Sequence, residues 1–555
     1  MVATATEHPG YTVLTRPERP IAILDRMRQL IASCVAALVS VCAPAAWGGD
    51  GVTDLLVVLR PGAVCTHSTI LRGRGAVQVS SSIWLWRLSA GGGSKALLER
   101  LRHDGALAFA EPDRLHRTAA SSTAVARADF GDPLVAASWW RQTIGVAELT
   151  PPGPGVPVTI VDSGVDFAHE EFTNRANTTP VNAQEPPGVG GRHGTMVASV
   201  LGAPVNGVGL VGIYPEAVLR SYDARISDET SLATGQIVAG ILAASEIGKG
   251  VINLSLGGSS RSLSIERAVH EAMRRGSLVV AAAGNSGDVG SALEYPAAVP
   301  HVFTVAATDQ TDTVARFSSR SGFVDLAAPG VDIGVARPVS LGGPYSEESG
   351  TSFAAPLVSG AAAWIWTLRP ELDASQVAEI LRASARDVGA PGWDKETGHG
   401  ILDVPAALAL PTPSADGGEP NDDIEFVDPA GTKYGGQLPL TTASQTAATI
   451  SARLTRFDDP RDVHRLWLPR RSTVTIAVQS DLPVRLQLFR AGSAATVLGT
   501  GAAVDRLATT ATTTSGALTY TNRDQGRVAY VAVLMPRTPG RSIAYSLSVT
   551  SDRNL

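Results

Sequence analysis

Cysteine is scarce in this chain of 555 residues, and none occurs after Cys65. The other two, Cys34 and Cys42, lie near the N-terminus. Beyond residue 65 the chain therefore has neither a disulfide nor a thiol nucleophile. This excludes a cysteine-dependent active site there, and an exported form would depend on its packed core and on bound ions for stability.

A surplus of charge of either sign is also lacking. The chain has 46 basic and 52 acidic residues, a formal net charge of −6, and no basic run with interleaved aromatic residues. We therefore expect no binding to nucleic acid or to an anionic membrane surface. With 44% hydrophobic and 18% charged residues, the chain has the composition of a well-packed protein of three or four structural units.

Long hydrophobic runs are confined to one place near the N-terminus. The run Leu30–Val41 follows Arg26 and Arg28 and precedes the small residues Ala43–Ala45. This order of basic, apolar and small residues is typical of a secretory signal peptide, and the run is shorter than the ~20 residues that a spanning helix needs. We therefore predict a signal segment over residues 1–46 and a secreted or periplasmic protein.

Other interpretations of this run stay open. They are a buried helix, an uncleaved membrane anchor and, because of the segment Ile31–Cys34, a lipoprotein signal. Met27 is an alternative start of translation. No comparable apolar run closes the chain, so we expect no C-terminal anchor and no stable membrane span once the signal has been removed.

The apolar pattern next indicates a small α+β unit over residues 51–118. A strand is predicted at Leu55–Leu59, a helix at Lys95–His103 and a further strand at Ala106–Ala110. Residues 119–134 are mostly small and polar and have no periodicity, which is typical of an exposed link.

Between residues 135 and 410, apolar strands alternate with helices. The predicted strands are Pro157–Val161, Val251–Leu256 and Ser277–Ala283, and the predicted helices are Gly194–Leu201, Gln236–Glu246 and Ser264–Arg275. Fully apolar strands separated by helices predict an α/β fold, in which a parallel twisted sheet carries helices on both faces. In such sheets the chemistry gathers at the carboxyl ends of the strands.

The last part of the chain changes character. Residues 411–423 form a linker rich in Pro, Gly and Asp, and beyond it short strands separated by turn residues predict an all-β sandwich over residues 424–555. The predicted strands are Ser472–Val478, Val484–Phe489, Val528–Leu534 and Ile543–Val549.

Three polar residues of the α/β region form a candidate catalytic set. Asp162 ends an apolar strand, His193 opens a helix, and Ser352 opens a more apolar helix. A serine hydroxyl attacks an amide only when a base removes its proton, and the base needs a partner that fixes its tautomer and stabilises the imidazolium. An aspartate, a histidine and a serine meet these requirements together.

A group that binds the developing oxyanion is predicted beside them. The N–H groups at the start of the helix that carries Ser352 favour negative charge, and Asn285, just after an apolar strand, supplies a side-chain amide as a second donor. Each of the four residues is common in caps, turns or cores when taken singly. Their order along the chain, with all four at strand–helix junctions, points to nucleophilic catalysis.

These segments resemble those of the subtilisin-like serine proteases. The segment Ser349–Ala363 (SGTSFAAPLVSGAAA) is a nearly complete match to the serine signature of that family. The segments VDSGVDFAHEEF, which contains Asp162, and NLSLGG with AAAGNSG, which contains Asn285, are similar as well. The resemblance covers about residues 135–408, and the family has the same chain order of Asp, His and Ser.

The resemblance implies that Asp162, His193 and Ser352 are the catalytic triad and that Asn285 belongs to the oxyanion hole. The histidine segment, HGTMVASVLG, departs from the family pattern at Met196 and Ser199, where a His and a Gly are expected. Neither position carries the chemistry. The departure therefore concerns local packing more than activity.

By the same resemblance, an extended substrate would bind between two walls. One wall would consist of Ser255, Leu256, Gly257 and Gly258, and the opposite wall of Ala282, Ala283 and Gly284. Main-chain pairing with a strand suits an endopeptidase, because it accepts many sequences alike.

Glu294 resembles the floor of the primary specificity pocket in that arrangement. A buried carboxylate there would favour Arg or Lys in the substrate, because an unpaired charge is costly to bury. If Glu294 turned to solvent instead, the pocket would prefer bulky apolar groups.

The resemblance also implies a calcium loop containing Glu171 and Asn206. A carboxylate, an amide oxygen and backbone carbonyls are suitable ligands for this hard cation. The alternative is a surface glutamate and a turn asparagine. No cofactor is required for the chemistry itself, so calcium would be structural.

The flanking units have resemblances of their own. Residues 51–118 resemble the inhibitory prodomain of these proteases, which implies an intramolecular inhibitor and self-cleavage between about Leu115 and Asp129. From Glu419–Asp423 (EPNDD) onward, the chain resembles the pre-peptidase C-terminal domains of secreted bacterial proteases.

The sequence therefore predicts a secreted, monomeric serine endopeptidase that is made as a self-processing precursor. It would hydrolyse protein and peptide substrates through an acyl-enzyme on Ser352. Two alternatives stay open: a processing protease with narrow basic specificity, decided by Glu294, and an adhesin or binding protein with a vestigial protease domain. The complete catalytic set argues against the second alternative.

Overall fold

A computed structural model describes residues 54–60, 63–91, 93–118, 134–184, 191–226, 231–429, 436–455, 459–490, 497, 502–536 and 542–552. The predicted signal segment, with Cys34 and Cys42, and nearly all of the link over residues 119–134 lie outside the described residues. Among the helices of the described part, none has the length and apolar character that crossing a bilayer requires.

The N-terminal module is a four-stranded antiparallel sheet with two helices. Its strands are β1 (Asp54–Leu59), β2 (Val77–Ser80), β3 (Leu85–Ser89) and β4 (Leu107–Pro112), and its helices are α2 (Val64–Arg72) and α3 (Ser94–His103). The strand order is β2-β3-β1-β4. Alternate residues of β1 (Leu55, Val57 and Leu59) pack against these helices, which confirms the strands and the helix that the apolar pattern predicts here.

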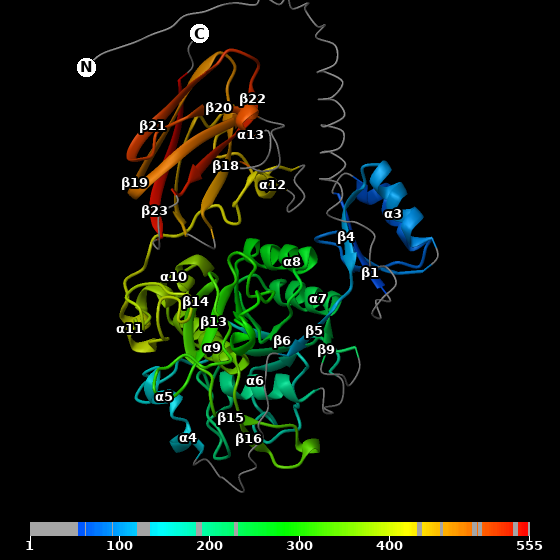
Figure 1. The fold of residues 1–555 in the computed structure, drawn as a ribbon, viewed down its shortest axis with the longest axis vertical. Helices are drawn as coiled ribbons and strands as arrows, with labels where there is room; N and C mark the ends of the chain where they lie inside the picture. The colour runs from blue at the N-terminus through cyan, green and yellow to red at the C-terminus, as the bar shows by residue number, and fades with distance from the viewer. Residues whose placement is uncertain are drawn as a thin grey trace, which may run out of the picture. The chain divides into compact units, whose positions relative to one another are not determined.

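The central region contains a seven-stranded sheet in which all neighbouring strands are parallel (Figure 1). Its strands are β6 (Val158–Asp162), β7 (Thr178–Pro180), β8 (Leu219–Asp223), β10 (Gly250–Leu254), β12 (Ser277–Ala282), β13 (Phe303–Thr308) and β14 (Val324–Pro329). Their order is β14-β13-β12-β10-β6-β8-β7. The predicted α/β fold with a parallel sheet is therefore confirmed.

Helices cover both faces of this sheet. The main ones are α6 (Arg192–Gly202), α7 (Thr234–Ser245), α8 (Leu263–Arg274), α9 (Thr351–Leu368) and α10 (Ala374–Ser384); shorter ones are α4 (Leu134–Ala137), α5 (Trp140–Thr143) and α11 (Val404–Ala409). Val158 and Ile160 of β6 pack with α6 and α9, whereas Val161 packs with α7 and α8. Because successive residues of a strand face opposite sides, a strand that is apolar throughout supplies two cores.

Two smaller sheets lie outside the main one. One contains β11 (Leu256–Gly257), β5 (Leu115–Thr118) and β9 (Ser231–Ala233), with β5 antiparallel to both neighbours. The other is the hairpin of β15 (Ile333–Ala336) and β16 (Tyr345–Glu348). In the sheet of β11, β5 and β9, the central strand β5 is more than 100 residues away in sequence from both of its neighbours.

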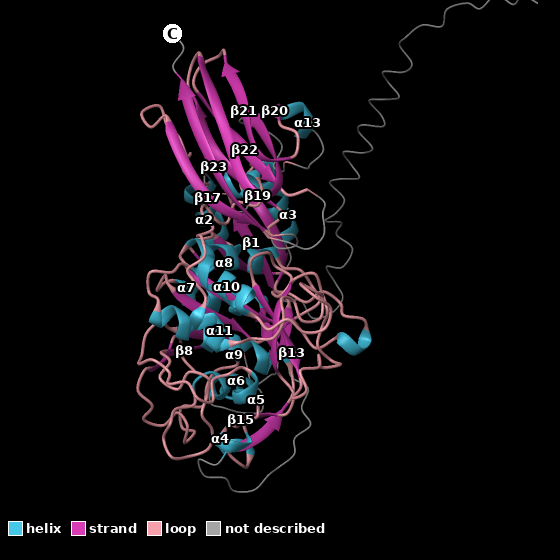
Figure 2. Ribbon diagram, turned by 90° about the vertical axis from the view of Figure 1, so that its left-hand side faces the viewer, coloured by secondary structure: helices cyan, strands magenta, loops and turns pink. Residues whose placement is uncertain are grey.

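The C-terminal region is an antiparallel β-sandwich, as predicted (Figure 2). Its elements are α12 (Ile424–Val427), β17 (Ala447–Leu454), β18 (Arg461–Leu468), β19 (Ser472–Arg490), α13 (Ala502–Asp505), β20 (Arg506–Thr509), β21 (Thr513–Asn522), β22 (Arg527–Leu534) and β23 (Ile543–Asp552). Inward-facing residues of these strands share one core, which includes Ile476, Leu486 and Val531.

The prediction of two separate strands at Ser472–Val478 and Val484–Phe489 is wrong. They form the single strand β19, whose pairing with β21 shifts register between Gln479 and Val484. The first half of β19 pairs with β21 and β23, and the second half with β22 and β20. The polar residues in the middle bend the strand from one sheet into the other and do not reverse the chain.

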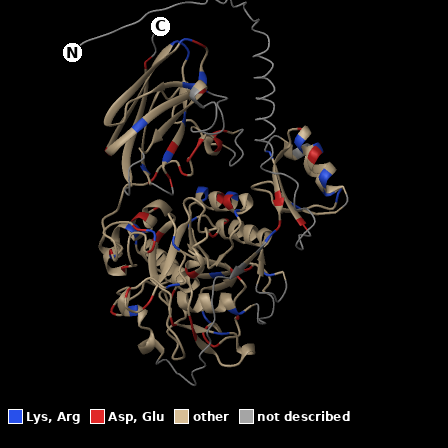
Figure 3. Ribbon diagram, in the orientation of Figure 1, with Lys and Arg blue, Asp and Glu red and all other residues tan. Residues whose placement is uncertain are grey.

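Basic and acidic side chains are interspersed along the described ribbon (Figure 3). Several form ion pairs with each other, such as Arg382 with Asp325 and Arg225 with Asp223. This mixture is consistent with the near-balance of charge in the sequence.

Candidate active site

Asp162 and His193 form a buried hydrogen-bonded pair at the carboxyl edge of the main sheet. Asp162 is the last residue of β6, and His193 lies in the first turn of α6. Nδ1 of His193 is 2.9 Å and 3.0 Å from the two carboxylate oxygens of Asp162. A carboxylate only accepts, so Nδ1 carries the proton and Nε2 is the basic nitrogen. Nε2 is buried and has no hydrogen-bond partner among the described residues.

The strand and the helix that carry this pair touch closely. The backbone N–H of Gly194 donates to Oγ of Ser163 at 3.0 Å, and the N–H of Ser163 donates to Asp162 Oδ1 at 2.7 Å. A Cβ on Gly194 would lie 2.1 Å from the carbonyl oxygen of Gly164. Only glycine at position 194 allows this approach, which sets the geometry between the carboxylate and the imidazole.

Ser352 is the second residue of α9 (Thr351–Leu368). Its Oγ donates to the carbonyl of Ser255 at 3.2 Å, and Oγ of Ser255 donates to the carbonyl of Ser352 at 2.8 Å. The ring of Phe353 lies 6.0 Å from the imidazole of His193, measured between centroids. The start of α9 is thus fixed between the candidate base and the predicted substrate strand.

Asn285 is held at the same helix terminus. Its Oδ1 accepts from the N–H of Thr351 at 3.0 Å and from Oγ1 of Thr351 at 2.9 Å. The N–H of Gly284 donates to the same hydroxyl at 3.2 Å. Since these bonds hold the amide oxygen, the amide nitrogen of Asn285 is the group that can donate to an oxyanion at the start of α9.

The part of Thr351 was not predicted from sequence. This residue precedes Ser352 and contacts Asn285, from which it is separated by 66 positions. Its location inside the SGTS segment is the one available signal. Only the folded sheet brings the two residues together.

The predicted substrate strand is paired with β5. Leu256 lies opposite Thr118 and Gly257 opposite Arg117, in antiparallel register. Gly258 instead exchanges hydrogen bonds with Tyr295, at 3.0 Å and 2.8 Å. The strand that was expected to receive substrate therefore holds a segment of this chain itself.

The residues predicted for the opposite wall lie at the carboxyl end of β12 (Ser277–Ala282). Ala282 and Ala283 are buried, and the N–H of Ala283 donates to the carbonyl of Val305. Gly284 has φ +103°, which favours glycine there.

Glu294 lies between the two walls. A Cβ on Gly284 would be 2.2 Å from Cδ of Glu294, and a Cβ on Gly257 would be 2.9 Å from Oε2 of the same carboxylate. The carboxylate accepts a hydrogen bond from Oγ of Ser319 at 3.4 Å. Burial raises the pKa of Glu294, and hydrogen bonds from Ser286, Ser319 and the Asn285 backbone oppose that rise. The side chain therefore points inward and does not turn to solvent.

Glu171 and Asn206 are also brought together. Nδ2 of Asn206 lies 3.5 Å from Oε2 of Glu171, while Oε1 of Glu171 accepts from the N–H of Leu210 at 2.6 Å and from the hydroxyl of Tyr345 at 3.1 Å. Glu171 is fully buried, and this burial raises its pKa to about 7. Asn206 presents its amide nitrogen to this carboxylate, while its Oδ1 accepts from the N–H of Val208 at 3.0 Å.

A buried aspartate–histidine pair, a serine at a helix N-terminus and an adjacent amide define a serine-type endopeptidase, on a parallel α/β sheet. The model of the subtilase family of peptidases matches residues 153–400. Subtilisin amylosacchariticus of Bacillus subtilis subsp. amylosacchariticus is 33% identical over 316 residues, which cover 56% of this chain and 77% of that relative. The chain belongs to the subtilase family.

Fervidolysin of Fervidobacterium pennivorans is a further relative, 34% identical over 326 residues. The match covers 52% of this chain and 46% of fervidolysin, so the chain spans about half of that relative's length. The crystal structure of fervidolysin, described as a keratinolytic enzyme related to subtilisin, is similar in fold. Its TM-score is 0.57 at 21% identity, over 84% of this chain and 85% of that one.

The crystal structure of an epidermin leader peptide processing serine protease from Staphylococcus aureus is similar as well. Its TM-score is 0.54 at 20% identity, and the match covers 65% of this chain and 99% of that one. At this identity, the likeness concerns the fold.

Proposed function

We propose that the protein is a secreted endopeptidase that cleaves protein substrates by acyl transfer to Ser352. The pair of Asp162 and His193 carries the proposal, because it provides a base of fixed tautomer beside a serine at a helix N-terminus. Nε2 of His193 takes the proton from Oγ as Oγ attacks the scissile carbonyl, while Asp162 stabilises the imidazolium. The proton then passes to the leaving amine, and water hydrolyses the acyl-enzyme with His193 as the base.

A fluorophosphonate probe tests this function directly. The processed protein is expected to take up one equivalent at Ser352, because the hydroxyl is activated by His193. Labelling is expected to disappear in Ser352→Ala and to fall sharply in His193→Ala, as measured by intact-mass spectrometry. An unlabelled wild-type protein in its processed form would contradict the proposal.

Asn285 is proposed to stabilise the oxyanion. Asn285→Ala is expected to lower kcat by about 10²–10³, the range measured in subtilisin itself for loss of one such donor, with little change in KM. The reason is that the donor acts mainly on charge that develops in the transition state. Steady-state kinetics on a chromogenic peptide would measure the effect, and an unchanged kcat would remove Asn285 from the oxyanion hole.

The N-terminal module is proposed to act as an intramolecular inhibitor. Its strand β5 occupies the position between β11 and β9 that an extended substrate would take. The carboxylate of Glu111 accepts from the N–H groups of Leu263 and Ser264 at 3.0 Å and 2.9 Å, at the start of α8. Asp113 accepts from the N–H of Gly235 at 2.8 Å, at the start of α7. A carboxylate at a helix N-terminus accepts from backbone N–H groups that have no partner within the helix, and the helix dipole stabilises its charge. These contacts therefore support tight docking.

Self-cleavage is proposed close to Thr118. This residue pairs with Leu256, one position after Ser255, whose carbonyl accepts from Oγ of Ser352. N-terminal sequencing of the mature protein is expected to give a start within one to three residues after Thr118. The rest of the predicted cleavage window, residues 119–129, lies outside the described residues. Ser352→Ala, purified alone, is expected to keep its full-length mass, and trimming of that variant would rule out self-processing.

Docking of the N-terminal module is expected to depend on pH through His116. Nε2 of this buried residue contacts Oγ1 of Thr234 at 2.9 Å, and burial together with Arg114 lowers the pKa of His116 to about 4 from 6.5. A lowered pKa in the docked state means that docking is strongest above pH 6.5 and weakens as the pH falls toward 4. The expected loss is on the order of 30-fold at pH 5 relative to pH 7.5.

Titration calorimetry with separately expressed N-terminal module and mature Ser352→Ala enzyme measures this dependence. The variant His116→Leu is expected to bind with a weaker pH dependence. If the wild-type and His116→Leu modules bound with the same pH dependence, protonation of His116 would not be the cause of that dependence.

A narrow basic specificity is the second candidate function, and the inward position of Glu294 between Gly257 and Gly284 favours it. Export through the N-terminal signal segment and a calcium ion at Glu171 and Asn206 belong to the same proposal. In support of calcium, Glu171 is a fully buried carboxylate with a raised pKa. The protein would act as a monomer on protein and peptide substrates.

A further inference from the structure

The two strands on either side of β5 each lead into a helix. β9 ends at Ala233, and α7 begins at the next residue, Thr234. β11 ends at Gly257, and α8 begins six residues later, at Leu263. Because β5 is antiparallel to both strands, the chain that precedes β5 runs toward the starts of these helices. A segment bound in this groove therefore meets two helix N-termini upstream of its paired residues.

The start of α8 binds the carboxylate of Glu111 through three donors. The hydroxyl of Ser262 donates to Oε1 at 2.8 Å, and the N–H of Ser264 donates to the same oxygen at 2.9 Å. The N–H of Leu263 donates to Oε2 at 3.0 Å. Ser262 is 4% exposed and Ser264 is 0% exposed, and Oγ of Ser264 has no hydrogen-bond partner among the described residues. This helix start is thus a buried polar site that a carboxylate from another segment occupies.

The start of α7 binds the carboxylate of Asp113. The N–H of Gly235 donates to its Oδ1 at 2.8 Å. A Cβ on Gly235 would lie 2.9 Å from Oδ2, so the absence of a side chain at this position leaves room for the carboxylate. The N–H of Thr234 donates to the carbonyl of Arg114 at 2.6 Å. The acidic side chain and the main chain that follows it are therefore held by neighbouring residues of one helix.

The electrostatics of α8 favour negative charge at its start. The acidic residue in its first turn, Glu266, is paired with Arg261, whose Nε and Nη2 lie 3.0 Å and 2.7 Å from Oε2 of Glu266. This pairing offsets a charge that would otherwise repel a bound carboxylate. The backbone N–H groups and the dipole of the helix then act on the bound anion, and hydrogen bonds to an ionised acceptor are stronger than those to a neutral one.

We propose that these two helix starts are carboxylate subsites of the mature enzyme, which become available to substrates once the N-terminal module has been removed. The inference rests on the proposed endopeptidase function and names the substrates preferred by it. They are protein segments with an acidic residue at five and at seven positions before the residue that pairs with Leu256. Asp113 and Glu111 stand at these distances from Thr118, which pairs with Leu256 in the module.

Removal of the module would leave the donors of both subsites without their carboxylates. A substrate that pairs with β11 and β9 in the register of β5 carries its upstream residues past the same two helix starts. Acidic side chains there restore the lost hydrogen bonds, whereas apolar ones leave buried donors unpaired. Both subsites lie upstream of the pairing residues, so they select substrates by binding and take no part in the bond that is cut.

The test compares two fluorogenic peptides that correspond to residues 107–124 of this chain. One has the native sequence, and the other has Glu111→Ala and Asp113→Ala. The mature enzyme, freed from its module, is expected to cleave the native peptide with a kcat/KM about 10²-fold higher at low ionic strength, which is about tenfold for each acid. The preference is expected to shrink in high salt, because ions screen the interaction between partly exposed charges.

Two enzyme variants assign the effect to the individual subsites. Gly235→Ala is expected to remove the advantage of the acid at the position of Asp113, because the added methyl group occupies the place of the carboxylate, while alanine is favourable in a helix. Ser262→Ala is expected to reduce the advantage of the acid at the position of Glu111. In each case the measured quantity is the ratio of kcat/KM between peptides that differ in that one acid.

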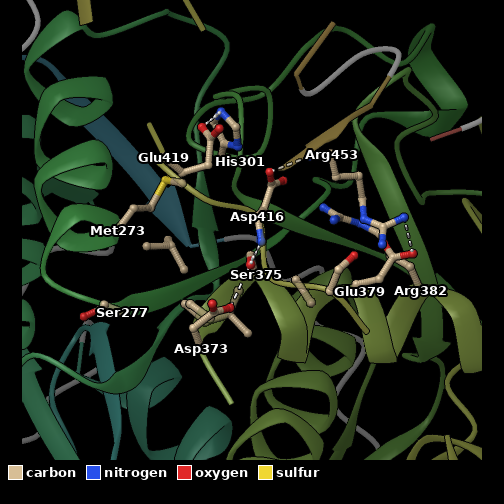
Figure 4. A pocket seen from close by; sticks show the side chains of 17 residues that line it. Met273, Ser277, His301, Asp373, Ser375, Glu379, Arg382, Asp416, Glu419 and Arg453 are labelled. Atoms are coloured by element: carbon tan, nitrogen blue, oxygen red, sulfur yellow. Dashed lines mark hydrogen bonds and ion pairs between the residues drawn. The ribbon is translucent and has the colours of Figure 1, made fainter. Parts of the chain in front are cut away.

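Ser375→Ala is the matched control for loss of a hydroxyl at a helix start. Ser375 lies in the first turn of α10, along a separate cavity of about 210 Å³ (Figure 4). Its Oγ donates to Asp373 at 2.7 Å and accepts from the N–H of Asp416 at 3.0 Å. The variant is expected to keep the full preference of the wild-type enzyme for the acidic peptide.

Binding gives a second readout that does not depend on turnover. Fluorescence anisotropy with the mature Ser352→Ala enzyme is expected to show tighter binding of the native peptide than of the doubly substituted one. Equal kcat/KM and equal affinity for the two peptides would overturn the carboxylate subsites and leave the endopeptidase function standing. A full preference retained in both Gly235→Ala and Ser262→Ala would overturn their assignment to these helix starts. If neither peptide were cleaved, the endopeptidase function would be contradicted, and the affinities alone would decide on the subsites.

Discussion

In the mature enzyme, expressed separately from the N-terminal module, Ser352→Ala and His193→Ala are each expected to lower kcat on the order of 10⁶-fold, the magnitude measured for the corresponding single replacements in subtilisin. The two replacements remove the nucleophile and its base, which act as one unit. The double variant is therefore expected to be hardly less active than either single variant, and stopped assays over hours would measure the residual rate.

Ser359→Ala is the matched control for this experiment. Ser359 lies two turns further along α9, and its Oγ donates to Asn253 at 2.9 Å, away from Ser352. The variant is expected to lose some stability and to keep its turnover. If Ser352→Ala retained more than about a thousandth of the wild-type kcat, the acyl-enzyme route would be wrong.

The second large effect is expected at Glu294. The wild-type enzyme should cleave peptides that end in Arg much faster than peptides that end in Phe, because the carboxylate lies close to Gly257 and Gly284, on the two walls of the proposed specificity pocket. Glu294→Gln is expected to lower kcat/KM for the Arg peptide by about 10³, since it leaves the guanidinium buried without a charge partner. Cleavage of the Phe peptide should be unchanged or faster.

The same preference should depend on pH. Burial raises the pKa of Glu294, so the carboxylate becomes protonated at a higher pH than an exposed glutamate does. The selectivity for Arg is therefore expected to be full above this raised pKa and to fall as the pH drops through it. Glu148→Gln, at an exposed position, is the control. A wild-type preference for Phe would show that the carboxylate does not select the substrate.

Much of the fold and of the candidate site could be predicted from local patterns. The strand that ends at Asp162 and the helix that begins around His193 are visible in the sequence, because apolar runs and helical spacing are local features. The predicted boundaries are less accurate. The helix that carries His193 begins at Arg192, two residues before the predicted start at Gly194. This places the imidazole inside the first turn and not ahead of it.

Features that depend on distant pairing could not be predicted in this way. The pairing of Thr118 with Leu256 joins residues that are 138 positions apart, and no local sequence pattern predicts it. The contact between Thr351 and Asn285 is of the same kind. His301, Asp422 and Asp459, whose side chains lie close together, likewise come from three distant segments, of which only the EPNDD stretch stands out in the sequence.

The N-terminal module has a second apolar face with a consequence for activation. Leu56, Val58 and Leu85 belong to the same buried cluster as Ile241 of α7 and Ile265 of α8. The proposed cut near Thr118 would break one covalent bond and leave this contact intact. Separation of the pieces would expose the cluster to water, at a cost of about 25 cal/mol for each Å² of apolar surface. If, as proposed, the module inhibits the enzyme, activity would begin only when the cut module is degraded, and it would therefore rise after a lag.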